Sequence, residues 1–144
     1  MTTTVTAAAG GLTPALDGFR LTLHVLAAAV WVGGQITVAG LLPTLRTLGE
    51  DAPRKAARAF GRVEWPAFAL LVLTGFWNLV AVKPSTQSQE WNAVLGIKMV
   101  MVLLAGVAVL LHQRSKTRTG LAVWGAIGAV TSLAALALGV FLGN

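Results

Sequence analysis

Four ionisable side chains stand within or at the ends of long apolar stretches of this sequence: His24, Glu64, Lys98 and His112. An ionisable group inside a lipid bilayer is costly unless it is paired or hydrated, so such residues are candidates for function. A lysine at that depth needs a partner, water or the loss of its proton. A histidine there is a possible metal or haem ligand. These four residues are therefore the first candidates for a functional site.

His24 belongs to a longer pattern on the first apolar stretch. Together with Trp31 and Gln35 it follows the spacing i, i+7 and i+11, which returns to one face of a helix. An aromatic ring, a possible ligand and an amide on one inward face suit a flat cofactor or a polar cavity. The alternative is structural: His24 and Gln35 hydrogen-bond across a helix bundle while Trp31 fills volume.

The elements that must position these residues follow from composition. Of the 144 residues 56% are hydrophobic and 11% charged, with a mean hydropathy of +0.75, whereas soluble domains carry about 25% charged residues. This excludes a disordered chain, a nucleic-acid-binding domain and most soluble enzymes, and the absence of cysteine excludes disulfides and thiolate metal sites. We expect an all-α, polytopic membrane protein, a four-helix bundle over residues 19–144, after a disordered segment 1–18. The expected spans, each near the ~20 residues that cross a bilayer, are Leu21–Leu42, Pro66–Val82, Ala93–Leu111 and Leu121–Gly143.

The basic residues predict an orientation. Eight of the eleven lysines and arginines fall between the first two or the last two spans, and such loops face the cytoplasm. We therefore expect a multi-pass protein of the cell (inner) membrane with both termini extracytoplasmic. The eight are Arg46, Arg54, Lys55, Arg58, Arg62, Arg114, Lys116 and Arg118.

The connection Pro43–Val63 carries most of this charge. Asp51 suits a helix N-cap and Pro53 a first turn, followed by basic residues at four-residue spacing. We expect a short basic helix here that contacts anionic lipid headgroups; an acidic protein partner is the alternative.

The orientation also sets the depth of the candidate residues. His24, Asn78 and Lys98 all fall in the extracytoplasmic half, so we expect them to converge in one site. Glu64 and His112 belong near the cytoplasmic face, where Glu64 could pair with His112 or with Arg62. Lys98 and His112 are separated by about 21 Å along their helix, so His24 and His112 are poor candidates for two axial ligands of one haem.

Small residues recur at four-residue spacing along the last span: Thr131, Ala135, Gly139 and Gly143. Such a stripe lets helices approach closely in lipid. It fits a monomeric bundle, a homo-oligomer or a contact with a membrane-complex partner equally well.

Three stretches resemble a known family. HVLAAAVWVGG (residues 24–34) is similar to the opening helix of the copper-resistance D (CopD) family and of the HemJ-type protoporphyrinogen oxidases. FGRVEWPAFALLVLTGFWNL, with Thr74 and Gly75, resembles their second helix, and LGIKMVMVLLAGVAVLLH, with Lys98, resembles their third. The first span lacks the Leu-Pro-Arg and His of HemJ, since Leu42 and Pro43 precede a threonine. The chain therefore looks more like CopD.

The resemblance implies two functions. CopD-like proteins are inner-membrane proteins associated with copper uptake or tolerance. HemJ-like proteins are haem-b-dependent oxidases in which a first-helix histidine and a third-helix lysine matter, and these map to His24 and Lys98. We expect a polar pocket of His24, Lys98 and Asn78, backed by Trp31 and Thr74, for haem b or copper, with His24 as the metal ligand. A non-catalytic accessory subunit of a larger complex is the third alternative, and whether the chain is an enzyme stays open.

Overall fold

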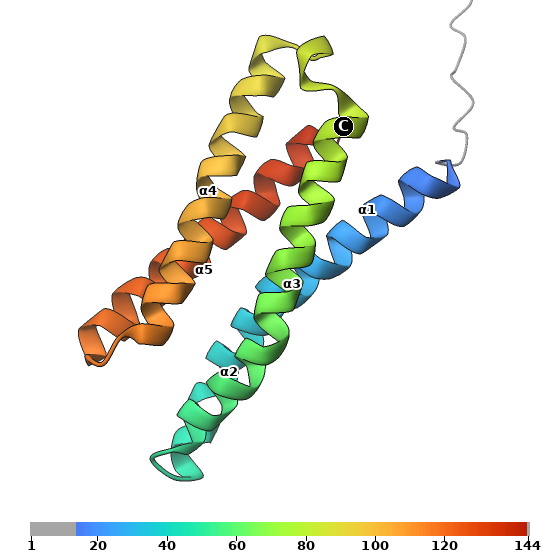
Figure 1. Ribbon diagram of the computed structural model, residues 1–144. Coiled ribbons are helices and arrows are strands. Elements are labelled where there is room, and N and C mark those ends of the chain that lie inside the picture. Colours follow the sequence, from blue (N-terminus) through green and yellow to red (C-terminus); the bar gives the residue numbers. More distant parts are fainter. Residues whose placement is uncertain (1–13, 144) are drawn as a thin grey trace, which may run out of the picture.

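The computed structural model describes residues 14–143, and all of its regular structure within that range is helical (Figure 1). The first long helix is continuous through three segments, because a π-helical turn, η1, joins α1 to α2. A short 3-10 turn, η2, connects α3 to α4. The elements are α1 (Ala15–Ala28), η1 (Ala29–Gly33), α2 (Gly34–Thr47), α3 (Ala52–Val82), η2 (Pro84–Thr86), α4 (Gln89–Arg114) and α5 (Arg118–Leu142).

Four of these helices are long and apolar enough to cross a membrane. They contain 33, 31, 26 and 25 residues, and about 20 residues span a hydrocarbon core. Large apolar side chains face outward around the molecule, including Val80 (76% exposed), Leu103 (66%) and Phe141 (68%). Water would oppose such exposure, whereas lipid does not. The predicted all-α fold with four helices long and apolar enough to span a membrane is therefore confirmed.

Local chemistry sets several helix ends. The Ser88 hydroxyl accepts a hydrogen bond from the Trp91 amide (3.1 Å) at the start of α4, and the Thr117 hydroxyl accepts one from the Gly120 amide (3.0 Å) at the start of α5. Helix α3 ends where Lys83 adopts a left-handed conformation, with φ of 53°. These caps place the turns between helices outside the apolar spans.

The basic connection differs from its expected form. Helix α2 continues past Pro43 to Thr47, and α3 already begins at Ala52. The predicted short basic helix is therefore not a separate element: its residues form the first turns of α3, which runs on through Pro66. Asp51 does occupy the N-cap position, but its side chain makes no capping hydrogen bond.

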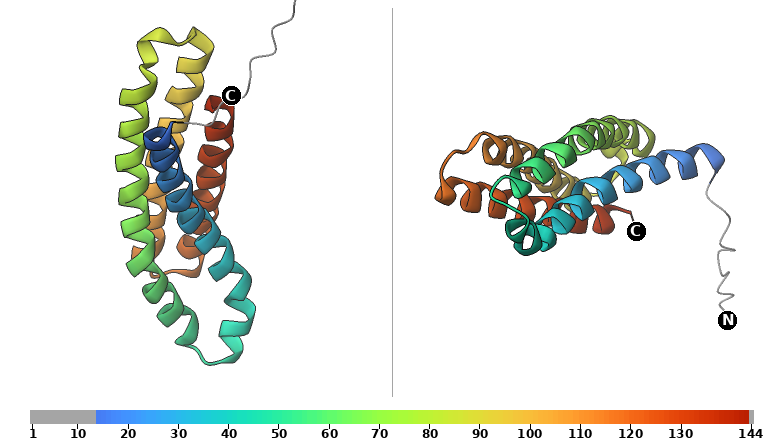
Figure 2. Two further views of the ribbon diagram at one scale, coloured as in Figure 1. Left: turned by 90° about the vertical axis from the view of Figure 1, so that its right-hand side faces the viewer. Right: turned by 90° about the horizontal axis from the view of Figure 1, so that it is seen from below.

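The four helices pack as two antiparallel hairpins, one made by α1–α2 with α3 and the other by α4 with α5 (Figures 1 and 2). Near the first helix's π-turn the hairpins meet, and Trp31, Val32 and Val109 form the buried centre of the core. The Phe68 ring lies against Gly106 of α4, where an added Cβ would stand 2.8 Å from the ring. Toward its N-terminus, α1 leans away from α3 in Figure 1.

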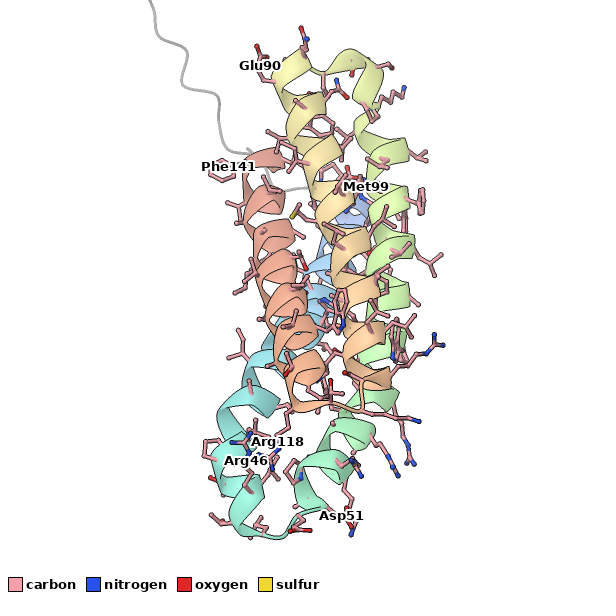
Figure 3. The ribbon with its side chains drawn as sticks, turned by 90° about the vertical axis from the view of Figure 1, so that its left-hand side faces the viewer. Arg46, Asp51, Glu90, Met99, Arg118 and Phe141 are labelled. Atoms are coloured by element: carbon pink, nitrogen blue, oxygen red, sulfur yellow. The ribbon has the colours of Figure 1, made fainter. Side chains whose placement is uncertain are left out.

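Both predicted basic connections lie at one end of the bundle. Figure 3 shows Arg46, Asp51 and Arg118 together at that end, with Glu90 and Phe141 toward the other. Met99, the neighbour of Lys98, lies on the Glu90 side in the same view. The predicted disordered segment 1–18 falls mostly outside the described residues, but from Ala15 onward the chain is helical.

Candidate functional site

A hydrogen bond between the first and second long helices defines the candidate site. Nδ1 of His24 on α1 lies 2.8 Å from Oγ1 of Thr74 on α3. Thr74 is 3% exposed, and its hydroxyl donates its single proton to the Leu70 carbonyl, 2.7 Å away. The oxygen must therefore accept from His24, so Nδ1 carries a proton. In the neutral imidazole Nε2 then keeps its lone pair and is free to act as a ligand or a base.

Two glycines make room for the side chains of this layer. The His24 ring packs against Gly75, where an added Cβ would lie 3.7 Å from Cε1. The Lys98 ammonium packs against Gly139 of α5, where a Cβ would lie 3.1 Å from Nζ. Lys98 is half-buried and lies near the His24 imidazole. The structure therefore brings a histidine and a lysine from different hairpins to one level of the bundle.

Arg20 joins this layer from α1, one helical turn before His24. It is only 6% exposed, and its Nη2 pairs with Asp17 at 3.1 Å. Its Nε and Nη1 have no hydrogen-bond partner within residues 14–143. On α3, one turn beyond Thr74, Asn78 has a buried Oδ1 that also lacks a partner in that range. We refer to Arg20, His24, Thr74, Asn78 and Lys98 as the His24 group.

The predicted site residues are thus placed unequally. His24 and Thr74 make a direct contact, and Lys98 lies at the same level. Asn78 belongs to the same layer through its helix position but forms no hydrogen bond to the other predicted residues. Trp31 does not reach the His24 group.

Trp31 instead organises the centre of the bundle. It is 3% exposed, and its Nε1 donates to the Ser132 hydroxyl on α5 at 2.9 Å. Its ring stacks on Phe68 at 4.4 Å and meets Trp65 edge-on at 6.1 Å. Gln35, expected on the same inward face, has a buried amide nitrogen without a partner in the described chain. The volume-filling alternative therefore describes Trp31.

Two features were missed from the sequence. Arg20 directly precedes the first predicted span, a position that favours the membrane surface, yet it is buried. Its position four residues before His24, on the same helix face, was the available signal. The π-turn at Ala29–Gly33 has no such signal in the sequence, although π-turns are frequent at functional sites.

A second polar group lies toward the Arg118 end. Glu64 is 4% exposed and accepts a hydrogen bond from Nε2 of Gln113 at 3.1 Å, while Oε1 of Gln113 accepts one from Nε1 of Trp65 at 3.0 Å. His112 bonds the Leu121 carbonyl through Nδ1 at 2.8 Å. Within residues 14–143 Glu64 therefore takes Gln113 as its partner in place of His112 or Arg62, and α5 supplies the partner of His112.

The stripe of small residues on α5 faces α4. Thr131 and Ala135 are 8% and 9% exposed, and Gly139 lies under Lys98. An added Cβ at Gly128, one turn before the stripe, would meet Val109 of α4 at 3.3 Å. The stripe thus serves close packing within the second hairpin.

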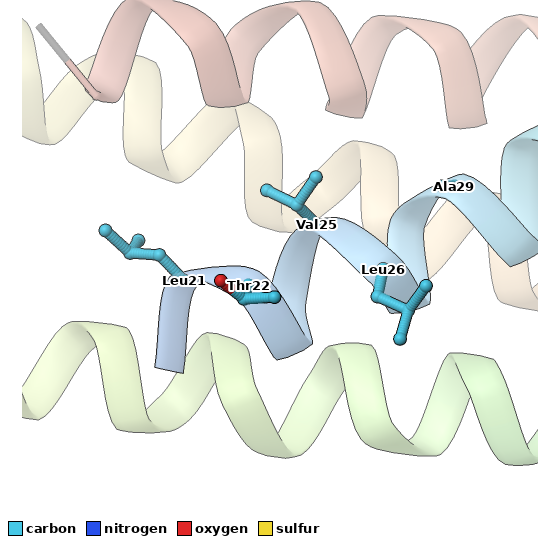
Figure 4. A pocket seen from close by; sticks show the side chains of 5 residues that line it. All are labelled: Leu21, Thr22, Val25, Leu26 and Ala29. Atoms are coloured by element: carbon cyan, nitrogen blue, oxygen red, sulfur yellow. The ribbon is translucent and has the colours of Figure 1, made fainter. Parts of the chain in front are cut away.

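An apolar hollow of about 450 Å³ opens on another face of α1 (Figure 4). It is lined by Leu21, Thr22, Val25, Leu26 and Ala29. None of these belongs to the His24 group, and at 100° per residue they lie on a different side of the helix from His24. The hollow is therefore separate from the candidate site.

The described residues offer few side chains that could ligate a metal ion without a cofactor. Among residues 14–143 no three His, Cys, Asp or Glu side chains gather closely enough to hold a metal ion. His24 is the histidine of its layer, and Asp17 is already engaged with Arg20. The donor set is thus one imidazole nitrogen beside two cationic side chains.

Fold and site together define a class: a four-helix, multi-pass membrane protein with a polar layer inside its apolar bundle. Comparison with known proteins identifies no family for the chain. No family model matches it, and neither a curated protein nor a solved structure does.

Proposed function

We propose that this protein is a membrane-embedded binding protein for a haem-type ligand, held by the His24 group. The observation that carries the proposal is the Thr74–His24 hydrogen bond, which orients the imidazole; in the neutral ring with Nδ1–H as the donor, Nε2 is the free nitrogen. Histidines that ligate metals usually donate their other ring N–H to a fixed acceptor, which orients the ring and raises its basicity. Thr74 supplies such an acceptor here.

The charges of the same layer support haem b over a copper ion. Haem b has one iron that takes an axial imidazole, and its edge carries two anionic propionates. Arg20 and Lys98 provide two cations beside His24. A copper ion bound by protein ligands alone would need further donors beside His24, and among residues 14–143 no three His, Cys, Asp or Glu side chains gather to supply them. The residues of this layer therefore fit haem better than copper.

In this proposal each residue has a defined task. His24 binds the iron through Nε2, Thr74 orients the ring, and the two cations hold the anionic edge. When bound, haem b supplies electron transfer or oxygen chemistry. Arg20 and Thr74 are buried, and burial strengthens the charge interactions of such groups.

Reconstitution with haem tests the proposal. The protein in mild detergent should bind haem b with a Soret band, and His24→Ala should lose that band. His112→Ala is the matched control, because His112 lies near the opposite end and bonds the Leu121 carbonyl; it should keep the band. Absence of a band in the unaltered protein, or its persistence in His24→Ala, would refute haem ligation by His24. Stoichiometric copper lost only in His24→Ala would favour copper handling instead.

We also propose that the Arg118 end faces the cytoplasm of a cell membrane, so that the His24 group lies in the extracytoplasmic half. The eight basic residues near that end support this orientation. The chain contains no cysteine, so a single introduced cysteine reports its own location. In intact cells an impermeant thiol reagent should label Ser85→Cys in the α3–α4 connection and spare Glu50→Cys. The reverse pattern would invert the topology.

A further inference from the structure

Only one of the three nitrogen atoms of the buried Arg20 guanidinium has a partner in the described chain. Nη2 meets Asp17, whereas Nε and Nη1 are buried and find no partner in the part of the chain that the structure describes. A guanidinium cannot lose its proton in a protein and has five N–H donors to satisfy. Unsatisfied buried donors are costly, most of all when they carry charge. This state indicates that something outside residues 14–143 completes the contacts of Arg20.

Helix geometry places Arg20 at the same level of the bundle as a second incomplete group. The His24–Thr74 bond fixes the register between antiparallel α1 and α3. Arg20 stands four residues before His24, and Asn78 four residues after Thr74, so both lie about 6 Å further along the same faces. Asn78 there has an amide whose oxygen is buried and unpartnered. No hydrogen bond joins the two residues, so Nε and Nη1 of Arg20 and Oδ1 of Asn78 remain without partners among residues 14–143.

The charge of the layer determines what this group must be. Arg20 and Lys98 are cationic, and the described acid that contacts the layer is Asp17, whose side chain is 44% exposed. The free donors of Arg20 call for oxygen acceptors, and the excess positive charge calls for an anion. Apolar side chains face outward at this end of α1, among them Leu16 (65% exposed) and Phe19 (58% exposed). An anion that reaches this place from the bilayer needs an apolar body.

We infer that Arg20, with Asn78 and Lys98 in the same layer, binds the anionic oxygen group of a membrane amphiphile, a carboxylate or a phosphate. Two sources share this chemistry: a propionate of a haem held by His24, and the phosphate of a phospholipid. The haem source rests on the proposed function, and in that case Arg20 is the residue that holds the propionate edge of the haem. The phospholipid source does not depend on that function.

The haem arm of the test compares haem b with its dimethyl ester, which keeps the iron and the ring but has no carboxylate charge. The unaltered protein should bind haem b about tenfold more tightly than the ester, the value of one charge-assisted hydrogen bond. In Arg20→Met the two should bind equally, and the Soret position should stay unchanged because His24 is intact. Arg46→Met, at the opposite end of the bundle, is the matched control and should keep the preference.

The phospholipid arm uses native mass spectrometry after delipidation and titration with dioleoylphosphatidylglycerol or dioleoylglycerol. The unaltered protein and Arg46→Met should retain the phosphate-bearing lipid over the neutral one, and Arg20→Met should not. If the unaltered protein binds no haem, the proposed function fails while this arm still decides the anion site. Equal behaviour of Arg20→Met and unaltered protein in both arms would overturn the inference.

Loss of folding does not make the test ambiguous. Arg20→Met leaves behind only Asp17, whose side chain is 44% exposed, so the variant leaves no buried charge without a partner and should fold. Arg20→Lys gives a second variant that keeps the charge and removes the guanidinium fork. Its preference for the anionic ligand should be intermediate, and a loss as complete as in Arg20→Met with intact folding would count against charge recognition.

Discussion

Replacing Thr74 by valine isolates the contact on which the candidate site depends. Valine keeps the shape of a side chain that is 3% exposed but removes the acceptor for the His24 ring. The His24 N–H then loses its partner inside an apolar bundle, which costs about 1–3 kcal/mol when a buried donor is left unsatisfied. In membrane proteins such interhelical pairs average nearer about 0.6 kcal/mol. We therefore expect Thr74→Val to lower the free energy of unfolding by about 0.6–2 kcal/mol.

A double-mutant cycle turns this expectation into a measurement of the pair. Unfolding of the unaltered protein, His24→Ala, Thr74→Val and the double variant, followed in mixed detergent micelles, gives the coupling energy directly. We expect about 0.6–1.7 kcal/mol, the range of interhelical hydrogen bonds in membranes. Thr74→Val should also weaken haem binding about 10-fold to 100-fold, as the loss of an orienting partner does at metal-ligating histidines.

The chain offers a matched control for the same substitution. Thr131 on α5 is 8% exposed and donates only to carbonyls of its own helix, those of Ile127 and Gly128. Thr131→Val should therefore show no coupling to His24 and no effect on haem affinity. A coupling between His24 and Thr74 no larger than that between His24 and Thr131 would refute the argument that Thr74 orients the imidazole.

Two further substitutions test the packing that holds the hairpins together, both by unfolding in detergent. Ser132→Ala removes the acceptor of the buried Trp31 indole, so we expect a loss of about 0.6–2 kcal/mol, and Trp31→Phe in the same chain should recover part of it. Gly106→Ala would place a methyl 2.8 Å from the Phe68 ring, whereas Gly139→Ala meets the end of a flexible side chain at 3.1 Å. We expect Gly106→Ala to cost about 1–3 kcal/mol and Gly139→Ala clearly less; equal effects would contradict the packing described.

The fold could be predicted from the sequence because membrane spans depend on length and composition. A run of about 20 apolar residues has few alternatives to a helix in lipid, and the structure places a long helix over each predicted run. Periodicity also placed His24 and Trp31 on inward positions. It could not distinguish their roles, since a spacing of seven gives the same face but not the same depth, and Trp31 meets Ser132 while His24 meets Thr74.

Other features depend on contacts that no local pattern contains. Glu64 is bonded to Gln113, 49 residues away in the sequence. Nothing in the spacing favours an amide over His112 or Arg62 as its partner, since electrostatics alone favours the cations. The choice is made by how α3 meets α4, where Gln113 also bonds the indole of Trp65. The same limit applies to the π-turn, which reflects packing between the hairpins.

The burial of Arg20 changes the role that its place in the sequence predicts. An arginine before an apolar span predicts a surface anchor, because its charge can reach the headgroups. At 6% exposure, Arg20 does not reach the headgroups in this way. Its one partner is the exposed Asp17, and its other two nitrogen atoms have no partner in the described chain. Burial of a permanent charge is tolerated where a counter-ion completes it. The incompletely paired arginine is therefore the observation on which the proposed anion site rests, and haem b, the ligand that we propose for His24, carries such an anionic group.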